Sequence, residues 1–133
     1  MAVRFHDAES LVQEHLAAEL PGVHVADAPP KESTTGQFIK ILRTGGSRMG
    51  RVVDQPILVV EAYADTPSAA WDLAEDARQS LEGMKAAFRV NPRVYKVAEV
   101  SGPANLPDPA HAGLSRYTQT IQLSIRYQAG ATP

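Results

Sequence analysis

Two segments of the chain repeat apolar residues at the spacing of an α-helix. The first spans residues 7–20, where Asp7 can cap the start and the Pro21-Gly22 pair ends the helix. Its apolar side consists of Leu11, Val12, His15, Leu16 and Leu20. Because such a helix has one face to bury, we expect it to cover part of a core built by other elements.

The second helical segment has the most regular pattern in the sequence. It starts at Thr66-Pro67, where proline lacks only an N–H that would be unpaired anyway and threonine can accept a hydrogen bond from the first turn. We expect it to run to about Gly83. One side carries Ala70, Leu73, Ala74, Ala77 and Leu81, and the other carries Asp72, Glu75, Asp76, Gln79 and Glu82. The small alanines would let this helix lie close to a sheet.

Strand patterns occupy much of the remaining chain. RYTQTIQLSIRY, residues 116–127, alternates between a face of Ile121, Leu123, Ile125 and Tyr127 and a face of Thr118, Thr120, Gln122, Ser124 and Arg126. Further strands are expected at residues 37–45, 54–64 and 93–100, with a short one at 22–27. This order predicts an α+β domain: a mostly antiparallel four- to five-stranded sheet with two main helices packed on one face. We expect one domain over residues 1–133, frayed at 128–133.

The stretch RTGGSRMGRVVDQP, residues 43–56, concentrates arginine and glycine between two predicted strands. A phosphate-binding loop would need Gly-Lys-Ser/Thr before a helix, whereas here no lysine follows and a strand comes next. Two interpretations remain. Gly45 and Gly46 can supply the positive φ angles of a hairpin turn whose arginines are solvated. Alternatively, the segment is a protruding basic tip that docks on an acidic partner surface, with contact residues Arg43, Arg48, Met49 and Arg51.

A second candidate contact segment is SGPANLPDPAHAGLS, residues 101–115, which we expect to be a long loop. Loops of this length inside a compact domain are uncommon and are usually functional or disordered. Its three prolines restrict the unfolded chain and favour a stiffened arm at an interface over a mobile linker. The expected contact residues of this arm are Pro103, Asn105, Leu106, Pro107 and Asp108.

The polar side of the second helix is strongly acidic. Its carboxylates can simply form a solvated helix face. This position speaks against catalysis, because a general acid or base needs a desolvated site with a shifted pKa. Alternatively, the side carrying Asp72, Glu75 and Asp76 meets the basic loop of an identical neighbour, which would give head-to-tail contacts and a closed ring. Trp71 lies beside the apolar stripe and is either the edge of the core or an interface anchor.

Composition argues against several other functions. The 133 residues carry a formal net charge of −2, so no global basic field favours nucleic-acid binding. There is no cysteine, and the four histidines are too scattered to suggest a metal site. The serine-nucleophile pattern Gly-x-Ser-x-Gly does not occur. We therefore predict no catalytic residue, cofactor or metal. Without a signal-peptide pattern or an apolar run of roughly 18 residues, we expect a chain made in the cytoplasm with no membrane partner.

Taken in order, these segments resemble a known protein family. VVDQPILVVEAYADTPSAAWDLAEDARQSLEGM, then VYKVAEVSGPANLPDP, then the RYTQTIQLSIRY strand, following a Gly/Arg hairpin, are similar to the tail terminator proteins of long-tailed (siphovirus-like) phages and prophages, especially those of actinobacterial hosts. The resemblance covers roughly residues 39–127. It is carried by the order and spacing of the elements and by the SGPANLPDP segment ahead of an RY strand.

The resemblance implies a structural role. Such a subunit would form a ring, expected to be hexameric, on the head-proximal end of the tail tube, where it stops tube polymerisation and joins the tail to the head-completion (stopper) protein. It would be a virion protein assembled in the host cytoplasm, and DNA would pass through the ring without specific binding. The alternatives are another head-to-tail connector, a minor capsid or tail component, or a small ligand-binding α+β domain with a concave pocket.

Overall fold

The computed structural model describes residues 4–28 and 37–128 of the chain. In order, the elements are α1 (Ala8–Glu19), β1 (His24–Ala26), β2 (Phe38–Met49), β3 (Val53–Ala64), α2 (Pro67–Glu82), α3 (Met84–Ala87), β4 (Arg93–Asn105), a 3-10 helix (Pro109–His111) and β5 (Ser115–Arg126). Most of the tail that we expected to fray, residues 129–133, lies outside the described residues. No helix among the described residues is long and apolar enough to cross a membrane.

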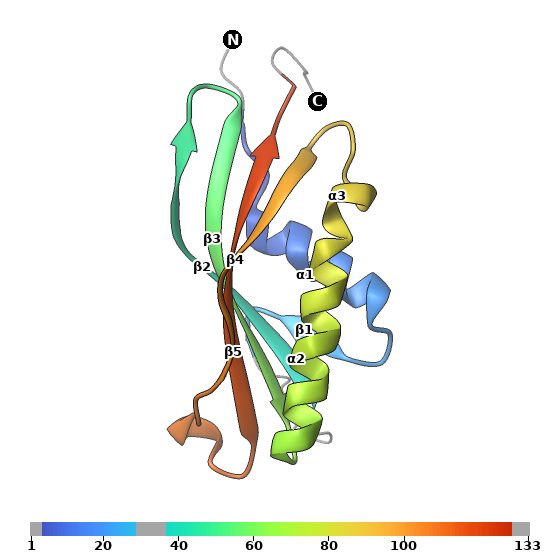
Figure 1. The fold of residues 1–133 in the computed structure, drawn as a ribbon, viewed down its shortest axis with the longest axis vertical. Coiled ribbons are helices and arrows are strands. Elements are labelled where there is room, and N and C mark those ends of the chain that lie inside the picture. Colours follow the sequence, from blue (N-terminus) through green and yellow to red (C-terminus); the bar gives the residue numbers. More distant parts are fainter. Residues whose placement is uncertain (1–3, 29–36, 129–133) are drawn as a thin grey trace.

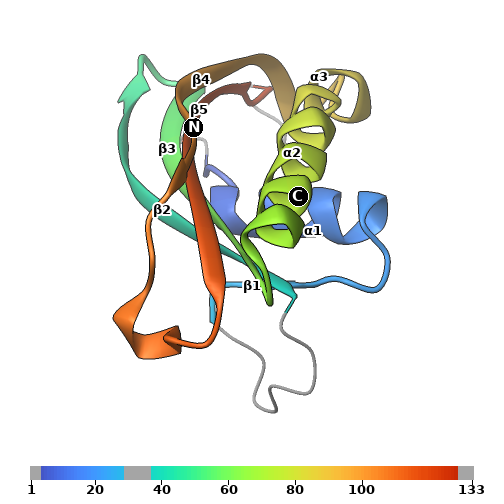
Figure 2. The same ribbon diagram turned by 60° about the horizontal axis from the view of Figure 1, so that its bottom comes forward.

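The strands form one five-stranded sheet in the order β1-β2-β3-β5-β4. The short β1 runs parallel to β2, and every other neighbouring pair is antiparallel. Helices α1 and α2 lie on the same side of this sheet (Figures 1 and 2). On the opposite side, the only helical segment among the described residues is the short 3-10 helix, whose His111 packs against Phe38 and Tyr63. The predicted α+β class, with a mostly antiparallel sheet and two helices on one face, is confirmed.

Helix α2 forms where the sequence pattern placed it. The Thr66 hydroxyl oxygen accepts a hydrogen bond from the Ala69 N–H at 3.1 Å, which satisfies one of the unpaired donors of the first turn. The helix ends at Gly83. Its predicted apolar side is the side that is buried: Ala70, Leu73, Ala74, Ala77 and Leu81.

Helix α1 is also capped as expected, because the Asp7 carboxylate accepts from the Glu9 N–H at 3.0 Å. His15 is one of its buried residues, and its Nε2 atom lies 2.6 Å from the Ser80 carbonyl oxygen in α2. This contact fixes α1 against α2.

The two helices and the inner side of the sheet enclose one hydrophobic core. The apolar face that the sequence pattern indicated at residues 121–127 is buried in this core: Ile121, Leu123, Ile125 and Tyr127. A polar residue, Gln119, is buried on the same face and donates from its amide to the Ala74 carbonyl oxygen at 3.0 Å. That hydrogen bond ties β5 to the middle of α2.

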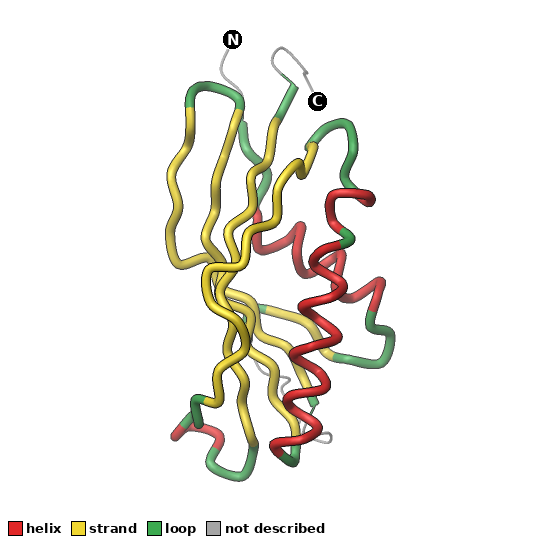
Figure 3. The backbone as a smooth tube through the Cα atoms, viewed as in Figure 1, coloured by secondary structure: helices red, strands yellow, loops and turns green. Residues whose placement is uncertain are grey.

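The interpretation that Gly45 and Gly46 supply the positive φ angles of a hairpin turn is right about the angles, which are 157° and 94°, but wrong about the turn. Strand β2 continues through both glycines to Met49, and the turn consists of residues 50–52 (Figure 3). The pairing register shifts between Arg43 and Gly45, which marks a β-bulge. Gly46 has a φ of 94°, and a Cβ atom there would lie 2.1 Å from the Gln55 carbonyl oxygen. The glycine is thus required by a close approach of two strands and not by a turn.

The predicted loop over residues 101–115 is also partly wrong. Strand β4 extends to Asn105, and Ala104 and Asn105 pair with Thr118 and Tyr117 of β5. Pro103 is tolerated because β4 is an edge strand and its register shifts between Ser101 and Ala104. The true connection therefore covers residues 106–114 and contains the 3-10 helix.

Candidate functional site

Three of the four residues predicted as hairpin-tip contacts do gather at the end of the β2–β3 hairpin. Arg48 and Met49 are the last residues of β2, and Arg51 lies in the turn. All three are exposed, with Met49 at 53%. Figure 1 shows this hairpin end at one extremity of the long axis of the molecule. The tip therefore presents positive charge and one apolar side chain to solvent.

Arg43, the fourth predicted tip residue, lies further back along β2. Its guanidinium group donates to both carboxylate oxygens of the buried Asp54, at 3.0 and 3.1 Å. Its backbone N–H donates to the Glu9 carboxylate of α1 at 2.7 Å. Arg43 thus joins α1 to the β2–β3 hairpin, and the carboxylate of Asp54 neutralises its charge.

The proline-containing connection lies at the other end of the long axis in Figure 1. It is anchored to the sheet through Asp108, which accepts from the Tyr63 hydroxyl at 2.7 Å and from the Ala110 N–H at 3.0 Å. The guanidinium group of Arg116 donates to the Leu106 carbonyl oxygen at 2.6 Å and to the Glu61 carboxylate at 2.7 Å. These bonds hold the connection against the side of the sheet opposite α1 and α2.

The electrostatics of this anchor follow from its hydrogen bonds. Hydrogen bonds from the Tyr63 hydroxyl and from His111 hold the pKa of the Asp108 carboxyl well below its usual range. Burial, together with the same hydrogen bond, raises the pKa of Tyr63 to about 12. Asp108 is thus an internal anchor of the predicted arm.

The remaining predicted arm residues divide by exposure. Leu106 is 50% exposed, and Asn105 and Pro107 are also exposed, while Pro103 is only partly so. The structure therefore leaves Asn105, Leu106 and Pro107 available for a partner.

On α2, the predicted interface residues divide into one that is paired within the chain and others that are exposed. Glu75 accepts from Arg78 at 2.8 Å, and Arg78 also donates to Glu99 of β4 at 2.8 Å. Asp72 and Asp76 are exposed and make no ion pair with any described residue. Trp71 is 41% exposed, and its ring meets Tyr117 edge-on at 5.4 Å. Trp71 therefore packs against Tyr117 of β5, which borders the core, and still offers surface.

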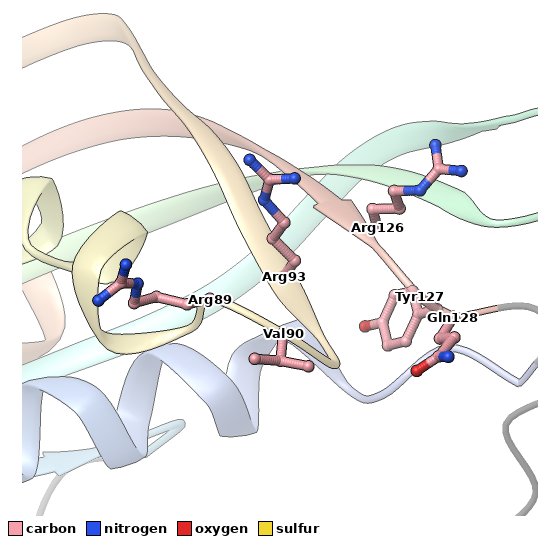
Figure 4. Close-up of a pocket in the computed structure, with 6 residues that line it drawn as sticks. All are labelled: Arg89, Val90, Arg93, Arg126, Tyr127 and Gln128. Carbon is pink, nitrogen blue, oxygen red and sulfur yellow. The ribbon is translucent and has the colours of Figure 1, made fainter.

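The structure also contains a basic cleft that was not predicted from the sequence. It has a volume of about 360 Å³ and is lined by Arg89, Val90, Arg93, Arg126, Tyr127 and Gln128 (Figure 4). Arg93 and Arg126 are far apart in sequence and meet only because β4 and β5 pair in this register. No local pattern could have brought them together, since each simply stands at the end of a strand.

Among the described residues, no three His, Cys, Asp or Glu side chains are grouped so that they could hold a metal ion. Three of the six residues that line the cleft are arginines and none is acidic, so its chemistry suits an anionic partner.

Comparison with known proteins places the chain in a family. No curated protein matches its sequence. One similar solved structure is a chain in the virion of a native gene transfer agent particle, with a TM-score of 0.67 and 14% identity over 90% of this chain and 94% of that chain, which shows a shared fold. The family model described as "Phage tail termination protein" matches residues 4–130, nearly the whole sequence. The chain therefore belongs to the phage tail termination protein family, whose members are structural proteins of phage tails.

Proposed function

We propose that this chain is the tail terminator subunit of a long-tailed phage or prophage of actinobacterial type. Copies of it form a six-membered ring on the head-proximal end of the tail tube, stop tube polymerisation there, and join the tail to the head-completion protein. The observation that carries this proposal is the family match over residues 4–130. The shared fold with a chain of the gene transfer agent virion supports a place in a virion.

The geometry is compatible with a ring subunit that has several neighbours. The basic hairpin tip and the connection with Leu106 and Pro107 lie at opposite ends of the molecule (Figure 1), so each can contact a different protein. We assign these two ends to the tail tube protein and the head-completion protein. The acidic side of α2, with Trp71, Asp72 and Asp76, is the proposed contact between subunits, because unlike surfaces that meet head-to-tail can close into a ring.

The proposed role is structural, with no catalytic residue, cofactor or metal. DNA passes through the ring without specific binding, which agrees with the net charge of −2 of the chain.

Negative-stain imaging of the purified protein, alone and mixed with tail tubes, tests the proposal. We expect six-fold rings, and labelled protein should be found at the head-proximal end of the tube. Label on the capsid, or at the other end of the tail, would instead favour a different connector or minor virion component. A monomer that neither forms rings nor binds tubes would contradict the proposal.

A further inference from the structure

Three arginines surround the basic cleft where β4 begins and β5 ends. Arg93 and Arg126 stand directly opposite each other on the paired strands, and Arg89 follows α3. Figure 4 shows the side chains of Arg93 and Arg126 extending to the same side, with Val90, Tyr127 and Gln128 beneath them. None of the three guanidinium groups forms an ion pair within the part of the chain that the structure describes.

Among the described residues, the cleft arginines share this lack of an ion pair with Arg4, Arg48 and Arg51, and they differ in it from the arginines that join elements of the fold. Arg43, Arg78 and Arg116 are each held by at least one carboxylate. Like charges placed opposite each other on neighbouring strands destabilise a sheet, and Arg93 and Arg126 are placed in this way. An external negative group that enters the cleft would relieve that repulsion.

The side chains beside the cleft favour a protein over a phosphate as the source of this negative charge. Val90 is 78% exposed, and Tyr95 is also exposed on the neighbouring β4 surface. Arginine combined with aromatic and aliphatic side chains is typical of the energetically important part of protein interfaces. The chain as a whole carries no net positive charge that would attract nucleic acid.

A complementary surface exists on the same chain. Asp72 and Asp76 lie one turn apart on the exposed side of α2 and make no ion pair with a described residue. The half-exposed Trp71 beside them can supply the apolar part of a contact, as Val90 does at the cleft. The two surfaces therefore match in both charge and apolar character.

We propose that the cleft of Arg89, Arg93 and Arg126 receives the acidic face of α2 from a second copy of this chain. The inference rests on the proposed ring and identifies the contact between its subunits. It makes the cleft, and not the hairpin tip, the basic partner of α2, so the tip remains free for another tail protein. Because the two meeting surfaces differ, each subunit can bind one neighbour through its cleft and another through α2, as ring closure requires.

Charge reversal with complementation tests this contact. One variant carries Arg93→Glu and Arg126→Glu, and the other carries Asp72→Lys and Asp76→Lys. Sedimentation velocity should show that each variant alone self-associates more weakly, by more than roughly tenfold, because like charges then face each other across the interface. An equimolar mixture should form rings again, since the acidic cleft of one variant fits the basic helix of the other. Far-ultraviolet circular dichroism checks that both variants are folded.

The matched control is Arg48→Glu with Arg51→Glu at the hairpin tip, which should leave the rings of the purified protein unchanged. Normal rings from the cleft variant, or a mixture of the two variants that stays dissociated, would overturn the inference. The proposed function would still be supported in that case if the wild-type protein forms rings. A wild-type protein that does not self-associate would contradict both. Binding to a labelled DNA duplex should be weak and unchanged in the cleft variant; if the cleft variant lost DNA binding and kept its rings, the cleft would be a phosphate site and the inference would be wrong.

Discussion

At the scale of the residue, Gly46 lets β2 and β3 approach each other more closely than a side chain would allow. Its φ of 94° lies in the left-handed region, and an added Cβ atom would meet the Gln55 carbonyl oxygen at 2.1 Å. Gly50, in the turn, also has a positive φ, of 69°, but a Cβ atom there would have nothing within 4 Å. An alanine at Gly50 would therefore cause backbone strain alone, whereas an alanine at Gly46 would cause both strain and a steric clash.

Gly46→Ala should lower the free energy of unfolding by more than about 2 kcal/mol, because strain and the clash add together. Gly50→Ala should cost only about 1 kcal/mol, from strain alone. Urea unfolding followed by circular dichroism measures both. Equal losses for the two variants would contradict the described path of β2.

The Asp108 carboxylate stabilises the fold in a pH-dependent way. Its pKa is lowered in the folded protein by the Tyr63 hydroxyl, so its contribution is fully present above the ordinary carboxyl pKa of about 4. The contribution declines as the pH falls below that value towards the lower folded pKa. Asp108→Asn should therefore destabilise the protein more at pH 7 than at pH 3. Urea titrations at the two pH values test this, and a difference from wild type that did not shrink at low pH would contradict it.

At the scale of the element, α2 shows why local patterns are readable. Its cap at Thr66, its end at Gly83 and its buried side all depend on residues within a few turns of each other, and each agrees with the sequence-based prediction. The extension of β2 to Met49 and of β4 to Asn105 depends instead on pairing with distant strands. Glycine and proline normally mark loops, but here they occupy bulged strand positions whose pairing partners could not be inferred from the sequence.

The candidate contact surfaces divide in the same manner. The exposed Arg48, Met49 and Arg51 and the acidic side of α2 were predictable from local sequence. The ion pair of Arg43 with Asp54 and the hydrogen bond of Asp108 with Tyr63 were not, because both join segments that only folding brings together. The basic cleft was missed for the same reason, since the β4–β5 register creates it.

Leu73→Ala tests which face of α2 is buried. Leu73 lies in the core, so its truncation should lower the free energy of unfolding by roughly 2–5 kcal/mol. Asp76→Ala, on the exposed side of the same helix, should change it by less than about 0.5 kcal/mol. Thermal or urea unfolding distinguishes the two, and a neutral Leu73→Ala would mean that the helix packs differently.

At the scale of the whole molecule, the β2–β3 hairpin projects a basic end that the core does not need. Replacing both Arg48 and Arg51 with glutamate should change the free energy of unfolding by only about 0.5 kcal/mol, because both side chains are exposed. The same change should impair assembly onto the tail tube, since it reverses the charge offered to an acidic surface. Co-sedimentation with purified tubes checks this, and unaltered binding would remove the hairpin tip from the interface.

The central claim is that this chain ends the growth of a phage tail. Measuring tail lengths by electron microscopy, in particles produced with and without the gene for this chain, tests it most directly. Without the chain, we predict tails of variable length that exceed the wild-type length and lack attached heads, and supplying the chain in trans should restore one length. Tails of normal, uniform length joined to heads in the absence of the chain would contradict the claim.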